Sequence, residues 1–406
     1  MNKILWQILW FIMLMAFTSI IYFLSLFINC PIIIILILTV IFGIFTYKWL
    51  NKNIQSSDIN AIDKRTQILY YIVLIAGIAI VINKIYYAQT QFGEWDSWWL
   101  WNYHARFLTH ENIKYISHQT KITHPDYPLM LPGMIALFWQ LFHTQNLIIP
   151  YIIGLFVTII IPVILYLDLY KKNFLIAGLV LLLIATDDIY LRFGLMQYAD
   201  IPLGLFFLCA FVCVQYAKEN TTFITLTAIF LGCCIWTKNE GIMLSLIFTL
   251  FHAKTLFTNN RWKHFIAGFA IPLAILIGYK YAMPATDLIK EQNHKTLTQF
   301  LDWNRYKLIW QYLWDNINGD FFYIKIGTIL YGIICFVEKK MPDKNILILL
   351  CCLIAVFFVF VFTTKTLQWH LETSMDRVLA QLMPAFVYVI AIQLSKLKLY
   401  LSDKQG

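Results

Sequence analysis

Long apolar segments, interrupted by short polar stretches, follow one another along the whole chain. About 20 helical residues are needed to cross the hydrocarbon core of a bilayer, so an apolar run of roughly 18 residues or more predicts a transmembrane span. The pattern therefore predicts an all-α, polytopic transmembrane helical bundle of about twelve spans. The runs cover residues 4–28, 31–50, 67–88, 146–168, 174–190, 200–217, 221–237, 241–257, 264–283, 321–338, 345–365 and 378–397.

Another apolar run, residues 129–142, is shorter, and the positions of Lys and Arg indicate whether it crosses the membrane. Cytoplasmic loops of membrane proteins collect these residues. If Lys3 is inside and the long runs cross in turn, the later basic clusters all fall inside; a crossing at 129–142 would move them outside. We therefore predict that 129–142 is a half-embedded helix on the outer side. The inner clusters are Lys48/Lys52/Lys64/Arg65, Lys171/Lys172, Lys218, Lys254/Arg261/Lys263, Lys339/Lys340/Lys344 and Lys396/Lys398.

The same alternation places four polar stretches outside, and they hold most of the Trp, His, Asp and Glu residues. These stretches are 89–128, 187–200, 284–320 and 366–377. Long loops that gather polar chemistry on one side indicate a catalytic face rather than a pore. We expect helices lying in the membrane interface within these outer loops, including a surface helix in 284–320 that serves as an anchor or as a lid.

Composition agrees with a membrane protein and excludes other classes. Apolar residues make up 60% of the chain and charged residues only 13%, with a mean hydropathy of +0.68. The formal net charge of +9 is explained by basic inner loops, and there is no basic soluble module to bind nucleic acid. The cysteines lie mostly in apolar runs and do not have metal-ligand spacing with His.

The first outer stretch carries two carboxylates, Glu94 and Asp96, within a Trp-rich segment. If this segment is helical, Asp96, Trp99 and Tyr103 share one face. Trp residues favour the membrane interface, so the segment can be an anchor. Carboxylates close to lipid are costly and are usually functional, and we therefore take Asp96 and Glu94 as catalytic candidates.

Further along the same stretch lie the candidates His124, Asp126 and Tyr127, with prolines at positions 125 and 128. Prolines before and after an Asp-Tyr pair fix an extended turn that leads into the helix at 129–142. The turn is either purely structural or holds these three side chains at the mouth of a cavity.

Two later segments place polar groups near the outer surface. Asp200, followed by Pro202, is typical of a helix start with Asp as the cap, and its carboxylate would face the outer cavity. The break at residues 236–241 contains Lys238, a cation where the positive-inside rule disfavours one. Lys238 either pairs with Glu240 or binds an anionic phosphate.

The last outer stretch contains His370, Ser374 and Arg377, which align on one face if the segment is helical. Arg377 is again a cation on the disfavoured side. It can be neutralised by Asp376, it can reach lipid phosphate, or it can belong to a row of donors aimed at a bound phosphate. We favour the donor row.

The order of these motifs resembles the GT-C superfamily of membrane glycosyltransferases, which includes protein O-mannosyltransferases and aminoarabinose–lipid A transferases. The likeness rests on Glu94-x-Asp96, on the turn Tyr127-Pro128 before a short helix, on Asp200 before a span and on the break at 236–241. It covers roughly residues 67–257. Residues 1–66 would then be two extra N-terminal spans, and 258–406 would hold the C-terminal spans. A large soluble C-terminal domain, as in oligosaccharyltransferase subunits, is not present in this sequence.

The resemblance implies an enzyme of the bacterial inner membrane whose active site faces the periplasm. The donor would be a polyprenyl-phosphate sugar, and the acceptor would be a lipid, glycan or protein. Asp96 would act as the base, and a single displacement would invert the anomeric centre. No cofactor is required by this chemistry; a divalent metal shared by Glu94, Asp96 and Asp200 is the alternative. The leaving phosphate needs cations, for which the candidates are Lys238, Arg106 and Arg377.

Two other functions compete with this prediction. A twelve-span count is common among transporters and lipid flippases, but their sites lie near the middle of the membrane, where these spans carry almost no ionisable residues. An O-antigen ligase or polymerase would centre on Arg and His in one long late loop, and 284–320 contains His294 and Arg305.

Overall fold

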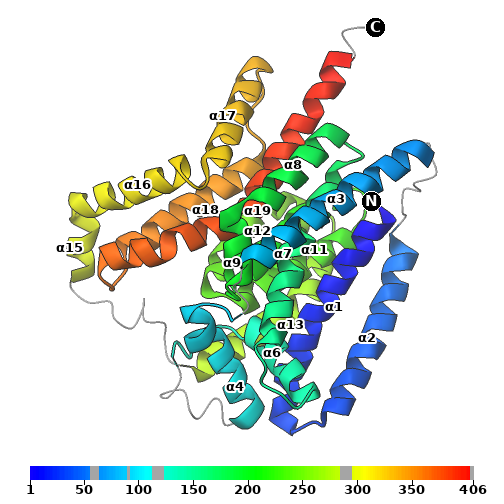
Figure 1. The fold of residues 1–406 in the computed structure, drawn as a ribbon, viewed down its shortest axis with the longest axis vertical. Coiled ribbons are helices and arrows are strands. Elements are labelled where there is room, and N and C mark those ends of the chain that lie inside the picture. The colour runs from blue at the N-terminus through cyan, green and yellow to red at the C-terminus, as the bar shows by residue number, and fades with distance from the viewer. Residues whose placement is uncertain (55–63, 89–91, 112–122, 284–294, 403–406) are drawn as a thin grey trace.

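The computed structural model describes residues 1–54, 64–88, 92–111, 123–283 and 295–402, and in these ranges the regular structure is entirely helical (Figure 1). The long helices are α1 (Lys3–Ser25), α2 (Ile32–Asn53), α3 (Lys64–Ala88), α7 (Ile148–Leu169), α10 (Asp200–Tyr216), α11 (Thr222–Thr237), α12 (Asn239–Phe257), α13 (Trp262–Ala282), α16 (Trp303–Asn318), α17 (Phe322–Val337), α18 (Lys344–Val361) and α19 (Leu367–Ser402). The shorter ones are α4 (Asn102–Glu111), α6 (Met130–Leu141), α8 (Phe174–Thr186), α9 (Asp188–Leu195) and α15 (Lys295–Leu301), with a π-helical turn at Ser97–Trp101 and a 3₁₀ turn at Leu26–Ile28.

Among the described residues, eight helices are long and apolar enough to cross a membrane, and the number rises to ten if each of two bent pairs is one span. The bent pairs are α8 with α9, at 60°, and α16 with α17, at 89°. The chain is thus an all-helical, polytopic membrane-type bundle, whereas a total of twelve spans stays a prediction. The difference lies partly in α10 and α11, which have only 17 and 16 residues.

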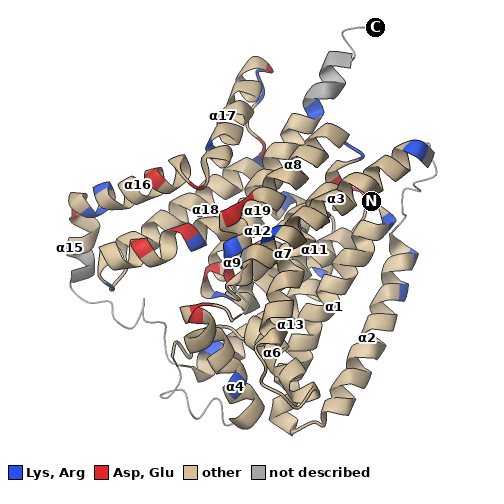
Figure 2. Ribbon diagram, viewed as in Figure 1, with Lys and Arg blue, Asp and Glu red and all other residues tan. Residues whose placement is uncertain are grey.

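Contacts between distant segments show that the helices run between two ends of the bundle. At one end, called the basic end, the Asn2 side chain donates to the Tyr170 hydroxyl and the Asn220 side chain donates to the Asn53 carbonyl. Arg261 contacts the Lys218 carbonyl there, and Lys344 contacts Thr255. These segments hold most of the inner basic clusters predicted above; α1 and α2 carry their few charges near one end (Figure 2).

The opposite end brings together segments from the predicted outer stretches. Tyr279 donates to the Pro125 carbonyl at 2.6 Å, and Tyr323 donates to Asp187 at 2.5 Å. Because α10 begins at this end and reaches the basic end at Tyr216, it runs the full length of the bundle in spite of its few residues. The grouping of segment ends that we inferred from charge alternation is therefore reproduced, while the side of the membrane that each end faces stays a prediction.

All four predicted outer stretches contain helices in their described parts. Residues 187–200 contain α9, whose first turn is capped by the Asp187 side chain accepting from the Tyr190 N–H. Residues 366–377 form the first turns of α19 rather than a loop. In 284–320 the described part forms α15 and α16, as expected for a surface helix, and residues 284–294, including His294, lie outside the described residues. The predicted 129–142 helix corresponds to α6, which packs against α1 and α4.

The centre of the bundle is formed by α10 and α11, which are apolar on nearly every face, and by the apolar part of α19, which is largely buried. Close approach of α10 to α19 needs a small residue: a Cβ atom on Gly204 would lie 2.8 Å from the Gln381 carbonyl oxygen. The start of α10 is therefore held beside the part of α19 around Gln381. In Figure 1, α15, α16 and α18 extend to one side of this centre, and α2 covers the other.

A buried carboxylate locks the same helices together at the basic end. Asp168 of α7 accepts hydrogen bonds from Tyr216 of α10 (2.5 Å) and Tyr388 of α19 (2.8 Å), and it pairs with Lys172. A fully buried carboxylate is tolerated when it is ion-paired and hydrogen-bonded in this way. The pair α10 and α19 is therefore fixed at both ends, by Asp168 at one and by the site described below at the other.

Substitution Gly204→Ala should destabilise the protein, because the added methyl group meets backbone rather than a movable side chain. Overpacking of this kind typically costs about 1–3 kcal/mol. We expect a lower midpoint of thermal unfolding for the purified protein in detergent. The matched control is Gly332→Ala in α17, where a Cβ would meet nothing within 4 Å. Equal midpoints for the two variants would contradict the packing described here.

The two ends of the bundle should lie on opposite sides of the membrane. We expect a membrane-impermeant thiol reagent to label Thr373→Cys and Thr258→Cys from opposite sides, since these exposed residues lie at opposite ends. The background should carry Ser in place of the partly exposed Cys30 and Cys351. Labelling of both positions in intact cells, or of neither until the cells are opened, would show that the two ends share a side.

Candidate functional site

A cavity of about 620 Å³ opens at the end of the bundle opposite the basic end. Its walls come from three parts of the chain that the sequence places far apart: the first outer stretch, α9 with the segment after it, and the first turns of α19. Lys238, at the break between α11 and α12, also lines it. The lining residues include Glu94, Trp95, Asp96, Trp99, His124, Tyr127, Arg192, Tyr198, Lys238, Lys365, Trp369, His370, Glu372, Ser374, Asp376 and Arg377.

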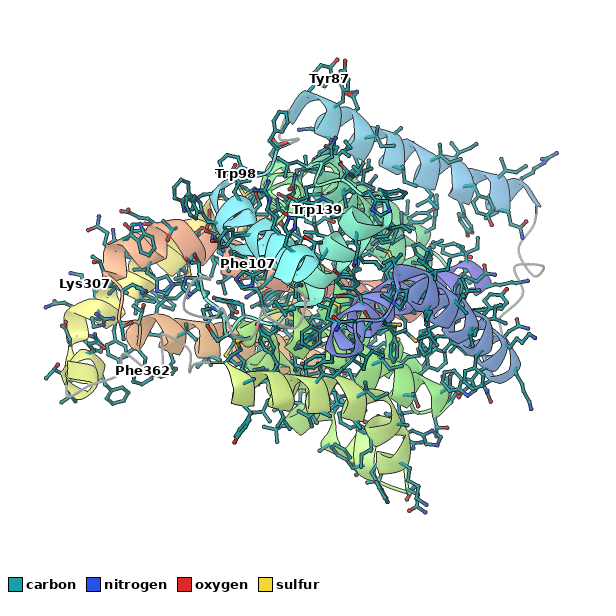
Figure 3. All side chains as sticks on the ribbon, turned by 90° about the horizontal axis from the view of Figure 1, so that it is seen from below. Tyr87, Trp98, Phe107, Trp139, Lys307 and Phe362 are labelled. Atoms are coloured by element: carbon teal, nitrogen blue, oxygen red, sulfur yellow. The ribbon has the colours of Figure 1, made fainter. Side chains whose placement is uncertain are left out.

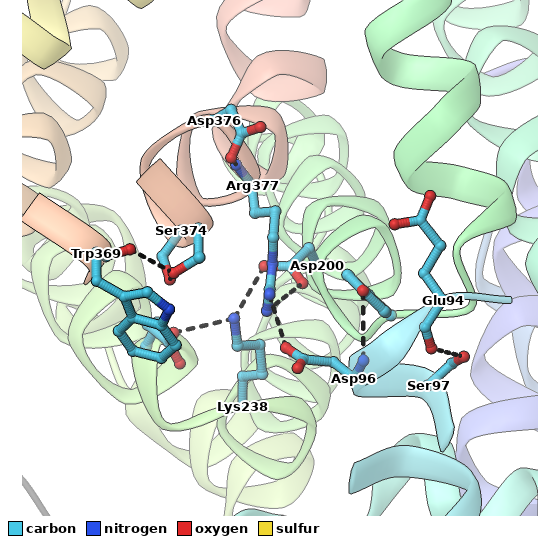
Figure 4. A network of polar contacts seen from close by, with 12 residues as sticks. Glu94, Asp96, Ser97, Asp200, Lys238, Trp369, Ser374, Asp376 and Arg377 are labelled. Carbon is cyan, nitrogen blue, oxygen red and sulfur yellow. Dashed lines mark hydrogen bonds and ion pairs between the residues drawn. The ribbon is translucent and has the colours of Figure 1, made fainter. Parts of the chain in front are cut away.

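Five charged side chains form one continuous network at this cavity, and Figure 4 shows Asp96, Arg377, Asp200 and Lys238 from it. The Arg377 guanidinium donates to Asp96 Oδ2 at 2.6 Å and lies 3.7 Å from Asp200 Oδ2. The Lys238 ammonium donates to Asp200 Oδ1 at 2.9 Å and lies 3.0 Å from Glu240. Asp200 thus stands between two cations, and each cation has a second carboxylate on its other side.

Burial makes this network expensive unless every charge has a counterion. The Asp200 side chain is fully buried, and that of Lys238 is nearly so. Burial alone would lower the pKa of the Lys238 ammonium, but the carboxylates of Asp200 and Glu240 outweigh burial and hold its pKa above the ordinary value. Lys238 therefore stays charged beside the cavity.

An aromatic ring helps to fix the position of Arg377. Its guanidinium carbon lies 4.6 Å from the centre of the Tyr198 ring, a cation–π contact. The Tyr198 hydroxyl accepts from the Asp96 backbone N–H at 3.4 Å. Burial raises the pKa of Tyr198 to about 12, so the hydroxyl stays protonated at neutral pH. Tyr198 consequently joins both partners of the Arg377–Asp96 pair.

Asp96 is placed by an unusual local backbone. Gly93 has φ of +72°, and a Cβ there would lie 2.3 Å from Ser97 Oγ, so only glycine fits. The Ser97 hydroxyl donates to the Glu94 carbonyl at 2.5 Å, and the chain then enters the π-helical turn 97–101. π-Helical turns are rare and are frequent at functional sites. Here the turn presents Asp96 to the cavity while Ser97 and Trp101 are buried.

The turn at 124–128 is clamped from α13. Lys280 donates to the Asp126 carbonyl and to the Asn239 side chain, both at 2.6 Å, and lies 3.3 Å from the Asp126 carboxylate. Asn239 itself donates to Asp126 at 2.8 Å. This clamp joins the Tyr127 wall of the cavity to the residue that follows Lys238, and it accounts for the burial of Asp126.

A buried histidine supports the same turn from α4. The ring nitrogen Nε2 of His104 lies 2.7 Å from the Thr123 carbonyl oxygen. Burial lowers the pKa of His104 to about 4, so the ring is neutral and donates its N–H to that carbonyl. His124 follows with φ of +48°, a conformation that directs the chain into the turn before α6.

Most of the residues singled out from the sequence meet at this site, but two do not. Glu94, Asp96, His124, Tyr127, Lys238, His370 and Arg377 line the cavity, and Asp200 and Glu240 contact Lys238. Arg106 is exposed on α4 away from the cavity, because it lies on the helix face opposite Ala105 and Leu108. Asp126 is buried in the Lys280 clamp instead of facing the cavity.

One local prediction was wrong because a tertiary contact prevails over a local one. Asp200 does not cap α10: it is the first helical residue, and its carboxylate turns to Lys238. Arg377 pairs with Asp96, while Asp376, one of the alternatives considered for its neutralisation, accepts from the Arg377 backbone N–H. The rings of Trp95, Trp99 and Tyr103 form one row at the four-residue spacing of a helix, and Asp96 and Trp99 both line the cavity.

The carboxylates considered for a shared metal are engaged with cations. Glu94 lies 3.9 Å from Arg192, while Asp96 and Asp200 contact Arg377 and Lys238. Within the described ranges, no three His, Cys, Asp or Glu side chains are arranged to hold a metal ion.

Sequence reasoning missed Arg192, Tyr198 and Lys280, which line the cavity or hold its wall. Arg192 and Lys280 carried one available signal, since both are cations at the end of the bundle where the charge pattern disfavours them. Tyr198 carried none, because its role arises from contacts with residues distant in the sequence.

No protein-family model, no curated protein and no solved structure matches this chain. What it does is therefore inferred from the chemistry of the cavity. A carboxylate beside an arginine and a buried lysine can accept a proton from one reactant while the cations stabilise negative charge on another.

Removal of Arg377 should destabilise the protein far more than removal of an exposed cation. Arg377→Met leaves Asp96 and Asp200 short of a counterion, and breaking a buried pair costs about 3–5 kcal/mol. The control is Lys84→Met, which removes the cation of the exposed Lys84–Asp188 pair (2.7 Å). Surface pairs contribute about 0–1 kcal/mol. Thermal unfolding of both purified variants tests this; an equal loss would show that the network does not hold the fold.

Proposed function

We propose that this protein is a membrane glycosyltransferase that transfers a sugar from a polyprenyl-phosphate donor to an acceptor outside the bacterial inner membrane. The observation that supports this most is the network Asp96–Arg377–Asp200–Lys238 beside a 620 Å³ cavity at one end of the bundle. The positive-inside rule favours an orientation with the basic end in the cytoplasm and the cavity on the periplasmic side.

The depth of the network suits a lipid-linked donor. Asp200 begins α10, and Lys238 separates α11 from α12, so both lie at helix ends and not in the middle of the bundle. A lipid-linked phosphate lies at headgroup depth, which is where these helices end. A site for a soluble substrate or a transported ion would not require this position, and transporter sites lie near the midplane.

The two cations are arranged to bind the donor phosphate. Lys238 and Arg377 both line the cavity and are held by the buried Asp200 carboxylate between them. Arg377 also contacts Asp96, and a bound phosphate would compete for that guanidinium. Donor binding would then release Asp96 from Arg377 and make it available to the acceptor.

The reaction follows from these positions. The Asp96 carboxylate accepts the proton of an acceptor hydroxyl or amine as its oxygen or nitrogen attacks the anomeric carbon. The bond between that carbon and the phosphate oxygen breaks, and its electron pair leaves with the polyprenyl phosphate. Lys238 and Arg377 stabilise the growing negative charge on this leaving group. One displacement inverts the anomeric configuration, and no covalent intermediate on the protein is needed.

The cations can supply the charge stabilisation that a divalent metal supplies in other enzymes, so the proposed chemistry proceeds without a cofactor. Surrounding membrane lipids would complete the donor site laterally. The rival ligase chemistry centred on Arg305 has less support. Arg305 donates to the carbonyls of Phe360 and Thr363, both at 3.2 Å, and does not line the cavity.

Asp96→Asn should abolish transfer, because an amide cannot accept the acceptor's proton. Loss of a general base typically costs about 10²- to 10⁴-fold in rate. The measurement is release of polyprenyl phosphate by the reconstituted protein, with radiolabelled polyprenyl-phosphate hexoses and pentoses as donors and a cell-envelope extract as the acceptor source.

The matched control is Asp188→Asn, the same chemical change at a highly exposed carboxylate of α9 that does not line the cavity. We expect it to retain the wild-type rate. Full activity of Asp96→Asn would overturn the assignment of the base. If the wild-type protein turns over none of the donors in the series, the proposed function is overturned.

A further inference from the structure

Four aromatic rings form a ladder that begins beside the catalytic carboxylate. Trp95, Trp99, Tyr103 and Phe107 recur at every fourth residue, and neighbouring ring centres are 5.7, 6.5 and 4.9 Å apart. Four residues of a helix advance by about 6 Å, so the rings form a row along the π-helical turn and α4. The functional argument above makes no use of this row.

The ladder has a cavity end and a distal end. Trp95 and Trp99 line the cavity on either side of Asp96 in the sequence, whereas Tyr103 and Phe107 lie beyond the lining. The row therefore continues from the cavity along α4, where Tyr103 and Phe107, the latter labelled in Figure 3, are half-buried. A third indole, Trp369 of α19, lines the cavity from another wall; Figure 4 shows it and Asp96 on opposite sides of Lys238.

Anchoring in the membrane interface does not account for these indoles. Trp98 is the appropriate comparison, because it lies in the same segment and is 45% exposed, against 52% for Trp99. Trp98 does not line the cavity, and its indole N–H donates to the Phe92 carbonyl at 2.5 Å, which suits an anchor. Trp95, Trp99 and Trp369 instead face a cavity that is lined by charged groups.

The chemistry of the walls fits a sugar ring. A pyranose has an apolar face of C–H groups that carry slight positive charge, and such a face packs on the electron-rich face of an indole. Its hydroxyl groups, at the edge of the ring, need hydrogen-bond acceptors. Glu372 and Asp376 supply carboxylates on the α19 wall, one and two turns beyond Trp369. A lipid acyl chain has no hydrogen-bond donors for these carboxylates.

We propose that the acceptor is a glycan chain, whose terminal sugar lies at Asp96 and whose preceding sugars stack on the ladder. This inference rests on the proposed function, since it names the acceptor of that reaction. The terminal hydroxyl gives its proton to Asp96 and its oxygen bonds to the anomeric carbon of the donor sugar. Polyprenyl phosphate leaves, and the glycan is longer by one sugar.

Binding of glycans without any donor tests the inference. The full-length protein in nanodiscs is titrated by calorimetry with linear tetrasaccharides of glucose, mannose, galactose and N-acetylglucosamine, and with a neutral peptide of similar mass. We expect at least one tetrasaccharide to bind and the peptide not to bind. Trp99→Ala should weaken that binding about tenfold, which corresponds to about 1.4 kcal/mol.

Two further variants distinguish stacking from a general loss of folding. Trp99→Phe keeps an aromatic face and should retain most of the affinity, whereas Trp98→Ala removes an equally large exposed indole outside the cavity and should bind as the wild type does. Equal weakening by Trp98→Ala and Trp99→Ala would overturn the ladder as a binding track. Binding of the peptide in place of the tetrasaccharides, or of neither, would overturn the glycan as acceptor.

The two proposals fail in different ways. Because no donor is present, glycan binding does not depend on whether the protein uses polyprenyl-phosphate sugars. If the protein turns over a donor but binds no glycan, the proposed transferase function is retained and the proposal that the acceptor is a glycan is overturned. Glycan binding by a protein that turns over no donor would remove the transferase, and with it the acceptor role of the bound glycan.

Discussion

The ion pairs of Asp200 with Lys238 and Arg377 are the interaction on which the rest of the cavity depends. A carboxylate with no exposed surface is stable here because two cations face it, and those cations come from two other parts of the chain. The pairing therefore fixes how α10, α19 and the α11–α12 break are placed relative to one another. Asp96 is then positioned by Arg377, and the first outer stretch by Asp96. The ion pairs that join these helices therefore also arrange the site.

The class of fold could be read from the sequence because bilayer physics constrains it strongly. Apolar runs and the sidedness of Lys and Arg were enough to group the helix ends correctly, including Asn2, Asn53 and Asn220 at one end. The number of spans was harder to predict, because α10 and α11 are short and two helices are sharply bent. A bend depends on the helices against which the two halves of the bent segment pack, and hydropathy does not carry that information.

The sequence indicated which residues belong to the site better than it indicated which of them pair with one another. Carboxylates and cations near the ends of apolar runs are costly, which made Asp96, Lys238 and Arg377 stand out. Their partners depend on helix rotation and on packing between segments up to 281 residues apart. The π-helical turn at 97–101 illustrates the limit. It follows Gly93, where a Cβ would collide with Ser97, and no periodicity of the apolar residues predicts it.

The hydrogen bonds that Asp168 accepts from α10 and α19 restrict the motion of these helices. Because α10 and α19 are joined at Asp168 and again at Asp200, with a backbone-to-backbone approach at Gly204 between them, neither can rotate or slide without breaking a buried polar contact. These two helices therefore form a fixed wall of the cavity. Any opening of the cavity must then come from the opposite wall, where α4 and the turn after it are held by hydrogen bonds such as those of His104 and Lys280. In the proposed reaction, one side of the cavity would keep the charges in register while the other would admit and release the reactants.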